Sequence, residues 1–511
     1  MDHRPLRFFH QGQIRAIAGL PTTTTVLQYL REQAPHCTGT KEGCAEGDCG
    51  ACTVLLGELD AGGALQLRNV NACTQFLPTL DGKALLTVED LGSSDNLNPV
   101  QQALVDCHGS QCGFCTPGFA MSLQACYEQH GEAGTRPTRQ ELADELAGNL
   151  CRCTGYRPIL DAGEQMFEAP PQRLDRAPIR AALQALRDDA PLHYAAPSPA
   201  FGGRIDHFHA PRTLAELAAL REARPEARLL AGSTDIGLWV NKQFRDVGEL
   251  IYLGNIAELR EIRPQAFDDA GRPGLWIGAG AALEEAWAAL SAIAAPLREL
   301  WLRFASKPVR NAGTLGGNIA NGSPIGDGAP ALIALGADIV LRRGAVQRRL
   351  PLQDFYLDYM KNALQPGEFL EALLVPLPAA DLRLRAYKIA KRYDSDISAV
   401  CAGLALRLAD GVVAEARFAF GGMAAIVRRA AKAEAAVLGQ AWNETTVAAA
   451  AAALAEDFKP LDDMRASAAY RMRVAQNLFR RLWLETREEA PLPAPALSVW
   501  QAVSFTRSAA A

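Results

Sequence analysis

The sequence predicts an α+β protein of several domains, and three observations lead to this prediction. The chain has 511 residues, which is enough for about three to four domains. Eleven of its twelve cysteines lie before residue 154, so the first third differs in chemistry from the rest. Residues 205–486 alternate strand-like and helix-like apolar patterns.

Composition excludes several classes of partner. Acidic and basic residues are mixed along the chain and give a net charge of −5, which argues against a nucleic-acid or membrane-surface partner. No apolar run reaches the roughly 18 residues of a membrane span. Residues 1–17 lack a basic segment followed by an apolar core, so no secretory signal is expected. We expect a cytoplasmic protein whose cysteines bind metal rather than form disulfides.

Residues 1–87 are predicted to form a mixed sheet with one helix. Apolar runs at 7–9 and 14–17 flank a turn at Gln11-Gly12, which indicates a hairpin. Threonines at 22–25 precede an apolar helical pattern, as expected of a capped helix. A glycine- and cysteine-rich loop then leads into a strand at 52–56, and this order fits a ferredoxin-like β-grasp domain.

The remaining chain is divided by changes of pattern. Residues 88–167 turn helical, with helices expected from Pro99, over 118–129 and over 138–150. Proline, alanine and charge then predict a linker with one short helix at 179–187. Strand 228–231 and strand 275–278 each run into a helix, and a second α+β unit contains a helix at 446–455. The predicted segments are a linker at 168–204, a third domain at 205–380, a C-terminal α+β subdomain at 384–486 and a tail at 487–511.

The first cysteine set is Cys44, Cys49 and Cys52, with Cys73 further on. The spacing C-x4-C-x2-C followed by a distant cysteine is the plant-type ferredoxin pattern for a [2Fe–2S] cluster. Glycines in the loop allow backbone amides to approach the sulfurs. Zinc is the alternative, but zinc sites usually combine two C-x2-C pairs. The spacing therefore predicts an iron–sulfur cluster.

The second set combines Cys112 and Cys115 with Cys151 and Cys153. Each pair lies where a predicted helix meets a loop, and helix-start amides favour a negatively charged cluster. By spacing alone zinc competes, because C-x-C is not a common iron–sulfur pattern. A neighbouring first cluster favours a second one, since two clusters form an electron relay. The other cysteines, Cys37, Cys107, Cys126 and Cys401, are predicted to be buried small hydrophobes.

Two glycine-containing loops of the third domain indicate nucleotide binding. Residues 229–236 form a strand, a tight turn and a helix start, which can present amides and a hydroxyl to a pyrophosphate. Residues 314–327 contain four glycines and offer Asn318, Ser323 and Asp327 as polar groups. Either loop by itself is more often an ordinary turn. Gly278-Ala279-Gly280 lacks the third glycine of the dinucleotide fingerprint, so we interpret it as a strand–helix turn.

Three runs together resemble a known family: TGTKEGCAEGDCGACTVL, QCGFCTPGFAMSL and NLCRCTGYRPI. They are similar to the iron–sulfur part of the molybdenum hydroxylases, also called the xanthine oxidase family. The resemblance implies a second [2Fe–2S] cluster in a helical-bundle domain and an FAD domain of the vanillyl-alcohol-oxidase type. In matching positions it implies these FAD-binding residues: Leu229, Leu230, Ala231, Gly232, Ser233, Thr234, Asp235, Ile236, Phe304, Thr314, Gly316, Gly317, Asn318, Ser323, Asp327, Leu370 and Lys388.

The resemblance also implies a division of labour. The family's molybdenum-binding part has no counterpart in this sequence, so a separate large subunit is expected to carry the molybdenum cofactor. This chain would be the small, electron-transferring subunit, passing electrons through two clusters to FAD and then to NAD, which approaches near residues 391–397. Fused iron–sulfur and FAD domains favour a bacterial enzyme that oxidises hypoxanthine or xanthine, assembled from two small and two large chains. The alternatives are a molybdenum hydroxylase for aldehydes, aromatic heterocycles or carbon monoxide, and a non-enzymatic module stapled by zinc.

Overall fold

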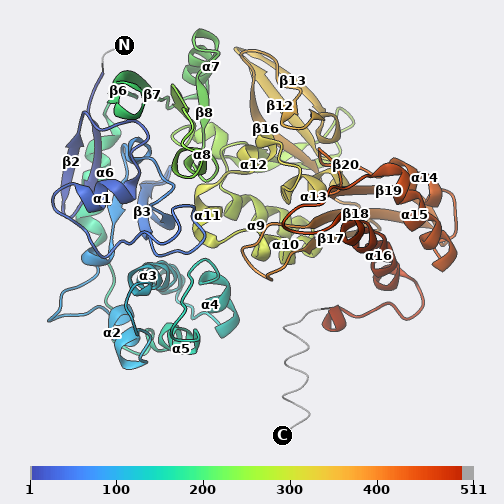
Figure 1. Cartoon of the computed structure of the whole chain (residues 1–511), viewed down its shortest axis with the longest axis horizontal. Helices are drawn as coiled ribbons and strands as arrows, with labels where there is room; N and C mark the ends of the chain where they lie inside the picture. The colour runs from blue at the N-terminus through green and yellow to red at the C-terminus, as the bar shows by residue number, and fades with distance from the viewer. Residues whose placement is uncertain (1–2, 498–511) are drawn as a thin grey trace, which may run out of the picture.

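The computed structural model describes residues 3–497 and shows four units that follow one another along the chain (Figure 1). The first unit is a five-stranded sheet of order β2-β1-β5-β3-β4, joined by one helix. Its elements are β1 (Leu6–His10), β2 (Gln13–Ile17), α1 (Val26–Glu32), β3 (Thr53–Leu59), β4 (Leu65–Asn71) and β5 (Ala84–Leu86).

Local sequence explains the start of this unit. The hairpin of β1 and β2 turns at Gln11 and Gly12, whose φ angles are +48° and +72°. Helix α1 begins after Thr25, whose side chain accepts a hydrogen bond from the backbone of Gln28 in a capping box. The expected hairpin and capped helix are confirmed.

The second unit is a cluster of four helices below the first sheet in Figure 1. They are α2 (Pro99–Asp106), α3 (Thr116–Ala133), α4 (Arg139–Glu145) and α5 (Arg157–Gln165). Helix α3 packs against β3 and β4, so the first two units are in direct contact. Helix α4 ends earlier than the expected 138–150, because residues 146–150 turn back toward the first unit, where the Leu150 N–H donates to the Cys49 carbonyl.

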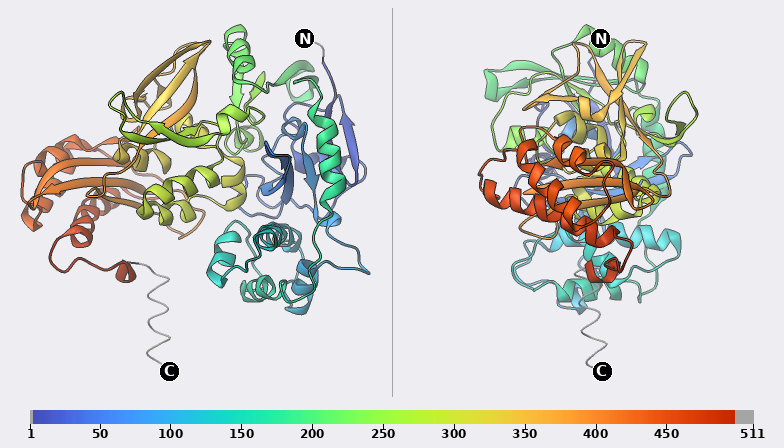
Figure 2. Two further views of the ribbon diagram at one scale, coloured as in Figure 1. Left: turned by 180° about the vertical axis from the view of Figure 1, so that it is seen from behind. Right: turned by 90° about the vertical axis from the view of Figure 1, so that its right-hand side faces the viewer.

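The expectation of a linker with one short helix at 168–204 is corrected. Helix α6 (Arg176–Arg187) is longer than expected and packs against β1 and β3 through Ile179, Leu183 and Leu186. Residues Leu192–Ser198 form strand β6, which pairs with β7 (Arg204–Ala210). Figure 2 shows α6 running along the first sheet before the chain enters the third unit. An apolar helix face and a pairing strand outweigh the proline- and alanine-rich composition.

The third unit contains two main sheets with helices between them and a separate two-stranded sheet of β14 and β15. The smaller main sheet has the order β6-β7-β9-β8 and the larger β10-β11-β16-β12-β13. Its helices are α7 (Leu214–Ala223), α8 (Ile236–Asn241), α9 (Leu283–Ile293), α10 (Arg298–Arg303), α11 (Lys307–Ala312), α12 (Leu315–Asn321) and α13 (Gly328–Leu335). Its strands after β7 are β8 (Arg228–Leu230), β9 (Leu250–Tyr252), β10 (Ile262–Ala266), β11 (Pro273–Gly278), β12 (Asp338–Arg343), β13 (Val346–Pro351), β14 (Tyr356–Asp358), β15 (Lys361–Asn362) and β16 (Phe369–Pro376).

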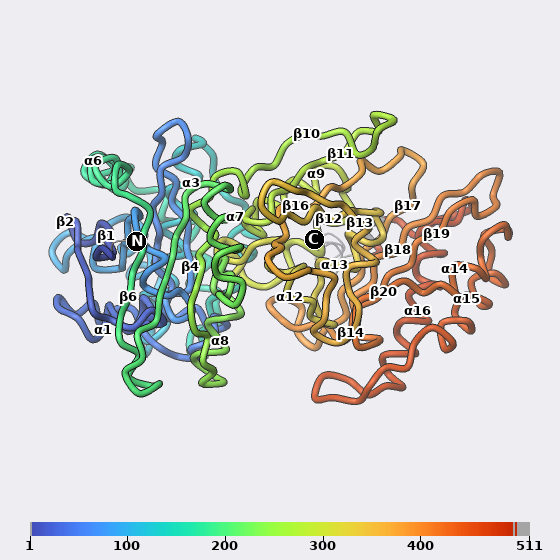
Figure 3. Tube along the Cα trace, turned by 90° about the horizontal axis from the view of Figure 1, so that it is seen from above, coloured from blue at the N-terminus to red at the C-terminus, as the bar shows by residue number. Residues whose placement is uncertain are grey.

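The fourth unit is a sheet of order β17-β18-β19-β20 packed against helices. Its elements are β17 (Arg383–Ile389), β18 (Val400–Ala409), β19 (Val412–Gly421), β20 (Arg428–Arg429), α14 (Ala431–Val437), α15 (Glu444–Asp457) and α16 (Ala468–Thr486). Helix α13 of the third unit packs against β18 and β19. Seen from above in Figure 3, this unit lies at the opposite end of the molecule from the first sheet.

The architecture confirms a mixed α and β multidomain protein. Of the expected tail at 487–511, the structure describes residues up to 497, with a 3-10 turn at Ala494–Leu497, and the rest lies outside the described residues. Among the helices that are described, none is both long enough and apolar enough to cross a membrane.

Candidate functional site

The first cysteine set is brought together by a loop and a turn of the first unit. The loop before β3 carries Cys44, Cys49 and Cys52, and Cys73 follows β4. The Cys44 thiol contacts the thiols of Cys49 and Cys73, and Cys73 also contacts Cys52. The Cys49 N–H donates to the Cys44 sulfur at 3.3 Å. All four thiols therefore lie in one connected group.

The backbone of the loop lies close to the sulfur atoms of this set. A Cβ atom at Gly43 would lie 2.9 Å from the Cys49 sulfur. Gly47 and Gly50 have φ angles of +82° and +68°, which side chains rarely allow. Contacts with the Cys49 and Cys73 thiols lower the pKa of Cys44 well below its usual value. The same contacts raise the pKa of Cys49 and Cys73, so it is the convergence of four thiols that fits an iron–sulfur cluster.

The second set lies at the start of α3 and in the loop before α5. Cys115 contacts Cys151, and Cys112 contacts Cys153. Burial, then the contact with Cys151, raises the pKa of Cys115 to about 12. Burial opposes ionisation of Cys151, but hydrogen bonds from the Thr154 hydroxyl and amide and from the Cys153 amide lower its pKa to about 7. Cys112 and Cys153 are exposed, so this set reaches the surface.

The two thiol sets belong to loops that touch. The Leu150 N–H, next to Cys151, donates to the carbonyl of Cys49 at 3.0 Å. The Asn149 side-chain amide donates to the Gly50 carbonyl at 3.1 Å. Within residues 3–497 no three His, Cys, Asp or Glu side chains converge as ligands of a single metal ion. The thiols instead form two adjacent groups of four.

The remaining cysteines stand apart from both groups. Cys37, Cys126 and Cys401 are buried, as predicted, whereas Cys107 is only partly buried and donates to the Gln165 side chain at 2.8 Å. Burial raises the pKa of Cys37 to about 11, so it stays a neutral thiol.

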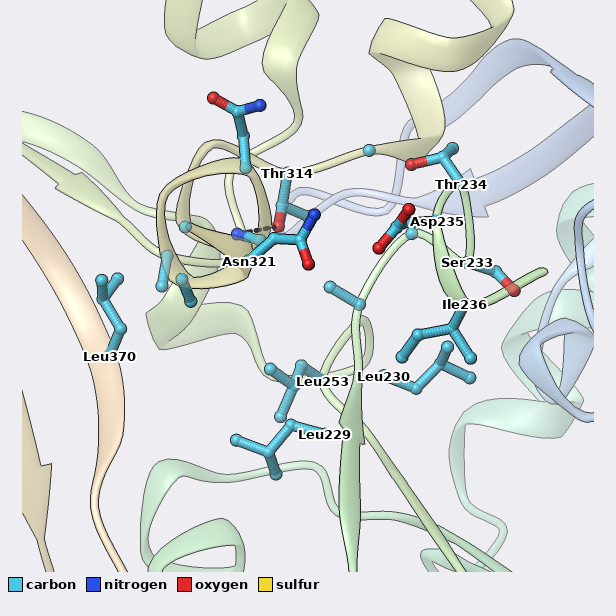
Figure 4. Close-up of a pocket in the computed structure, with 18 of the residues that line it drawn as sticks. Leu229, Leu230, Ser233, Thr234, Asp235, Ile236, Leu253, Thr314, Asn321 and Leu370 are labelled. Carbon is cyan, nitrogen blue, oxygen red and sulfur yellow. Dashed lines mark hydrogen bonds between the residues drawn. The ribbon is translucent and has the colours of Figure 1, made fainter. Parts of the chain in front are cut away.

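A cavity of about 470 Å³ lies between the two sheets of the third unit. Figure 4 shows Ser233, Asp235 and Ile236 from the loop after β8 on one side and Leu370 of β16 on the other. Asp235 and Asn321 point toward one another across it (Figure 4). Most of the predicted FAD-binding residues line this cavity: residues 229–236, Phe304, Thr314, Gly316, Gly317, Asn318 and Leu370.

The size and lining of this cavity fit a nucleotide. Its volume of about 470 Å³ lies within the range of cofactor pockets. Gly232, Gly316 and Gly317 lie in its wall, where the absence of side chains lets a ligand approach the backbone. A Cβ atom at Gly232 would lie 1.8 Å from the Ala312 carbonyl oxygen, so only glycine fits there. Burial raises the pKa of Asp235, against the opposing effects of Arg245 and Asn321.

Three predicted FAD-binding residues lie outside the lining of the cavity. Lys388 Nζ donates to Asp327 Oδ2 at 2.5 Å and to Ser398 at 2.9 Å, and Ser398 donates to Asp327 Oδ1 at 2.5 Å. Ser323 accepts from the Ile325 N–H. Asp327 and Lys388 thus neutralise one another in a buried group beside β17 and α13. Neither residue lies in the wall of the cavity, so their contact with FAD stays a prediction.

Sequence reasoning missed several lining residues, among them Arg228, Trp239, Val309 and Asn321. Arg228 and Arg245 both approach the Trp239 ring, at 5.3 and 4.9 Å from its centroid. The strand–helix turn at Ala279 also lines the cavity. Asn321 had a signal, because it directly precedes a glycine of the second loop, whereas Val309 had none.

The cavity touches the first cysteine loop. Val309 lines the cavity. Its side chain would lie 3.7 Å from a Cβ atom at Gly47, a residue of the loop between Cys44 and Cys49. The Asn241 side-chain amide at the end of α8 donates to the Cys73 carbonyl at 2.7 Å. The Gln75 amide donates to the Gly232 carbonyl at 2.7 Å. The first thiol group and the nucleotide loop are therefore parts of one interface.

Three family models match consecutive parts of the chain. Residues 87–164 match a [2Fe-2S] binding domain. Residues 201–378 match the FAD binding domain in molybdopterin dehydrogenase, and residues 385–486 match the CO dehydrogenase flavoprotein C-terminal domain. The second thiol group lies in the first of these regions, and the cavity lies in the second.

Similar proteins match one or both halves of the chain. A xanthine dehydrogenase of Emericella nidulans is 31% identical over 94% of this chain, which spans 38% of that protein's length. Two solved structures match about half of this chain at a TM-score of 0.50. One is a carbon monoxide dehydrogenase from Hydrogenophaga pseudoflava, 30% identical, covering 54% of this chain and 94% of its own. The other is the quinoline 2-oxidoreductase from Pseudomonas putida 86, 26% identical, covering 56% and 98%.

Proposed function

Because the chain belongs to the molybdenum hydroxylase family, we propose that it is the electron-transfer subunit of a xanthine dehydrogenase. A xanthine dehydrogenase matches 94% of this chain, including both the thiol-bearing half and the cavity. An aldehyde oxidase covers 89% of this chain at 28% identity, below the 31% of that xanthine dehydrogenase. The higher identity over a longer stretch supports xanthine dehydrogenase.

The observation that carries the proposal is a series of contacts: the second thiol group touches the first, and the first touches the cavity. The second group reaches the surface through Cys112 and Cys153 and touches the first group through Leu150 and Cys49. The first group touches the cavity through Gly47 and Val309. When bound, two [2Fe–2S] clusters and FAD would supply one-electron transfer and its conversion to hydride transfer to NAD.

The chain's own residues have distinct tasks in this arrangement. The cysteines Cys44, Cys49, Cys52 and Cys73 would hold one cluster, and Cys112, Cys115, Cys151 and Cys153 the other. The glycine loop at 231–235 would accommodate the pyrophosphate, and Thr314, Gly316 and Gly317 would line the cofactor beside it. Residues 391–397 would flank the approach of NAD.

The partner belongs to the proposal. A large subunit with the molybdenum cofactor would dock where Cys112 and Cys153 are exposed and would hydroxylate hypoxanthine or xanthine. We further propose that two small and two large chains assemble in the cytoplasm. Carbon monoxide and aromatic heterocycles are second candidate substrates, favoured by the structural relatives at 30% and 26% identity. Aldehydes are a further candidate, favoured by an aldehyde oxidase that is 28% identical over 89% of this chain.

The test begins with the assembled enzyme. Purification of the full chain with its co-purifying large subunit should give xanthine-dependent NAD reduction. Turnover of aldehydes or carbon monoxide without turnover of purines would reject xanthine dehydrogenase. Stoichiometric zinc in place of iron would support the zinc-stapled module and reject the relay.

A cysteine variant tests the relay. Cys112→Ser should remove one of two [2Fe–2S] EPR signals and abolish xanthine-to-NAD transfer, because it removes a ligand of the outer group. NADH oxidation by artificial dyes should survive, since the first group and the cavity stay intact. Cys107→Ser is the matched control, because Cys107 lies outside both groups. Loss of both activities in a folded Cys112→Ser protein would contradict the order.

A further inference from the structure

Arg310 is a buried arginine directly behind the wall of the cavity. Its side chain is only 2% exposed, and it lies on α11 between two residues of the lining, Val309 and Thr314. Arg310 itself is outside the lining, so it would not touch a bound cofactor. A buried guanidinium needs several partners, and these reveal its role.

The partners of Arg310 come from two other segments of the cavity wall. Its Nε donates to Glu284 Oε2 at 2.5 Å. Its Nη1 donates to the carbonyls of Leu302, Phe304 and Ala305 at 3.4, 3.2 and 3.0 Å. One side chain thus joins the start of α9 and the turn after α10 to α11.

The turn after α10 needs this support. Carbonyl groups at the C-terminal end of a helix have no partner within the helix, and Arg310 supplies donors for them. Ala305 has a φ of +50°, a conformation that a residue with a Cβ atom adopts at a cost. Without the guanidinium, the turn would lose the hydrogen bonds that hold this conformation.

The residue that this turn presents to the cavity is Phe304. Its ring lines the cavity and packs on Trp287, with the centroids 5.7 Å apart. Glu284, the carboxylate partner of Arg310, also accepts from Trp301 at 3.1 Å and follows the lining residue Leu283. The position of Phe304 therefore depends on the network centred on Arg310.

We propose that Arg310 is a positioning residue that fixes Phe304 against the FAD in this cavity. The inference rests on the proposed function, because it takes FAD as the occupant. It adds a residue that acts on the cofactor through a phenylalanine and a turn. A general structural role is the competing explanation. It predicts that replacing Arg310 lowers stability and that any effect on FAD affinity is the same with and without Phe304.

A double-mutant cycle on the full-length chain separates the two explanations. FAD affinity is measured by quenching of flavin fluorescence, and the flavin absorption bands are recorded. Arg310→Met should raise the dissociation constant for FAD about tenfold, because it removes hydrogen bonds that involve a charged group. It should also shift the absorption bands. In a Phe304→Ala background the same change should have about a twofold effect or less, as coupling through Phe304 requires.

A matched control is available in the fourth unit. Arg471 is also 2% exposed, donates to the Gly422 carbonyl at 3.0 Å and pairs with Asp463 at 2.6 Å. Arg471→Met should lower the melting temperature and leave FAD affinity unchanged. If Arg310→Met does not fold, Arg310→Lys takes its place in the cycle. A lysine cannot reach Glu284 and all three carbonyls, so its effect should be about threefold.

The outcomes distinguish this inference from the proposed function. A folded wild-type chain that does not bind FAD overturns the proposed function. If the wild-type chain binds FAD, the proposed function stands. If Arg310→Met then weakens FAD binding equally in the wild-type and Phe304→Ala backgrounds, the positioning role is overturned. Unchanged FAD affinity in the Arg310 variant overturns it as well.

Discussion

At the scale of single residues, Gly232 limits what the nucleotide loop can tolerate. A Cβ atom there would lie 1.8 Å from the Ala312 carbonyl oxygen. Gly232→Ala should therefore weaken FAD binding by about 1–3 kcal/mol, the usual cost of overpacking. Flavin fluorescence titration of the full chain measures this.

Gly62→Ala is the control for that substitution. The nearest atom to its Cβ position is the exposed Asp60 side chain, at 3.3 Å, and this side chain can move. FAD affinity should stay at the wild-type value. Equal losses in both variants would show that the Gly232 loop does not bind the cofactor.

Single residues also mark how far sequence reasoning reached. The cysteine sets were predictable because most of their members are close in sequence, as with Cys44 to Cys52 and Cys112 with Cys115. Arg310 was not, because its partners belong to two other segments, including Glu284. Asp327 and Lys388 stay predictions as FAD contacts, since a buried ion pair joins them to one another.

At the scale of elements, a buried charge network holds the first sheet to the third unit. Lys83, 7% exposed, pairs with Glu58 of β3 at 2.8 Å and donates to Tyr252 of β9 at 2.8 Å. Arg260 of the third unit pairs with the same Glu58 at 2.8 Å. Burial lowers the pKa of Lys83, but Glu58 and Tyr252 outweigh it and raise the pKa, so the ammonium stays charged.

Glu58→Ala should leave that ammonium buried without a carboxylate. We expect the free energy of unfolding to fall by about 3 kcal/mol, because removing one partner strands the other charge. Chemical denaturation followed by circular dichroism measures the loss. Glu285→Ala breaks the more exposed pair with Arg68 across the same boundary and should cost about 1 kcal/mol or less. Similar losses in the two variants would contradict a buried role for Lys83.

Strand β6 and helix α6 show what element prediction missed. Their proline- and alanine-rich sequence resembles a linker, yet β6 pairs along its length with β7 and α6 covers the first sheet. Both outcomes depend on partners distant in sequence. Local propensity cannot see such partners.

At the scale of the whole molecule, the walls of the cavity are formed by segments spread between residues 228 and 370 of the chain. An unfolded chain cannot keep these walls together, so FAD should bind the native state alone. A free FAD concentration of 100 times the dissociation constant should then add about 2.7 kcal/mol of stability. Calorimetry of the full chain at increasing FAD concentrations should show a rising melting temperature.

The Gly232→Ala protein supplies the comparison for this experiment. Its melting temperature should rise less over the same FAD concentrations, because the substitution weakens FAD binding by about 1–3 kcal/mol. An equal rise in both proteins would mean that FAD stabilises the chain from another place.

Cysteine spacing alone predicts the first thiol group and its glycine turns, and the resemblance of the runs around the cysteines predicts the second group and the family. These features depend on spacing within short stretches, where chain geometry and glycine conformations restrict the possible arrangements. Three contacts are visible only in the folded chain: the two thiol groups touch, Val309 lies between the first group and the cavity, and Arg310 supports Phe304. These contacts arise from packing between segments far apart in the chain, and no local pattern encodes which segments will meet.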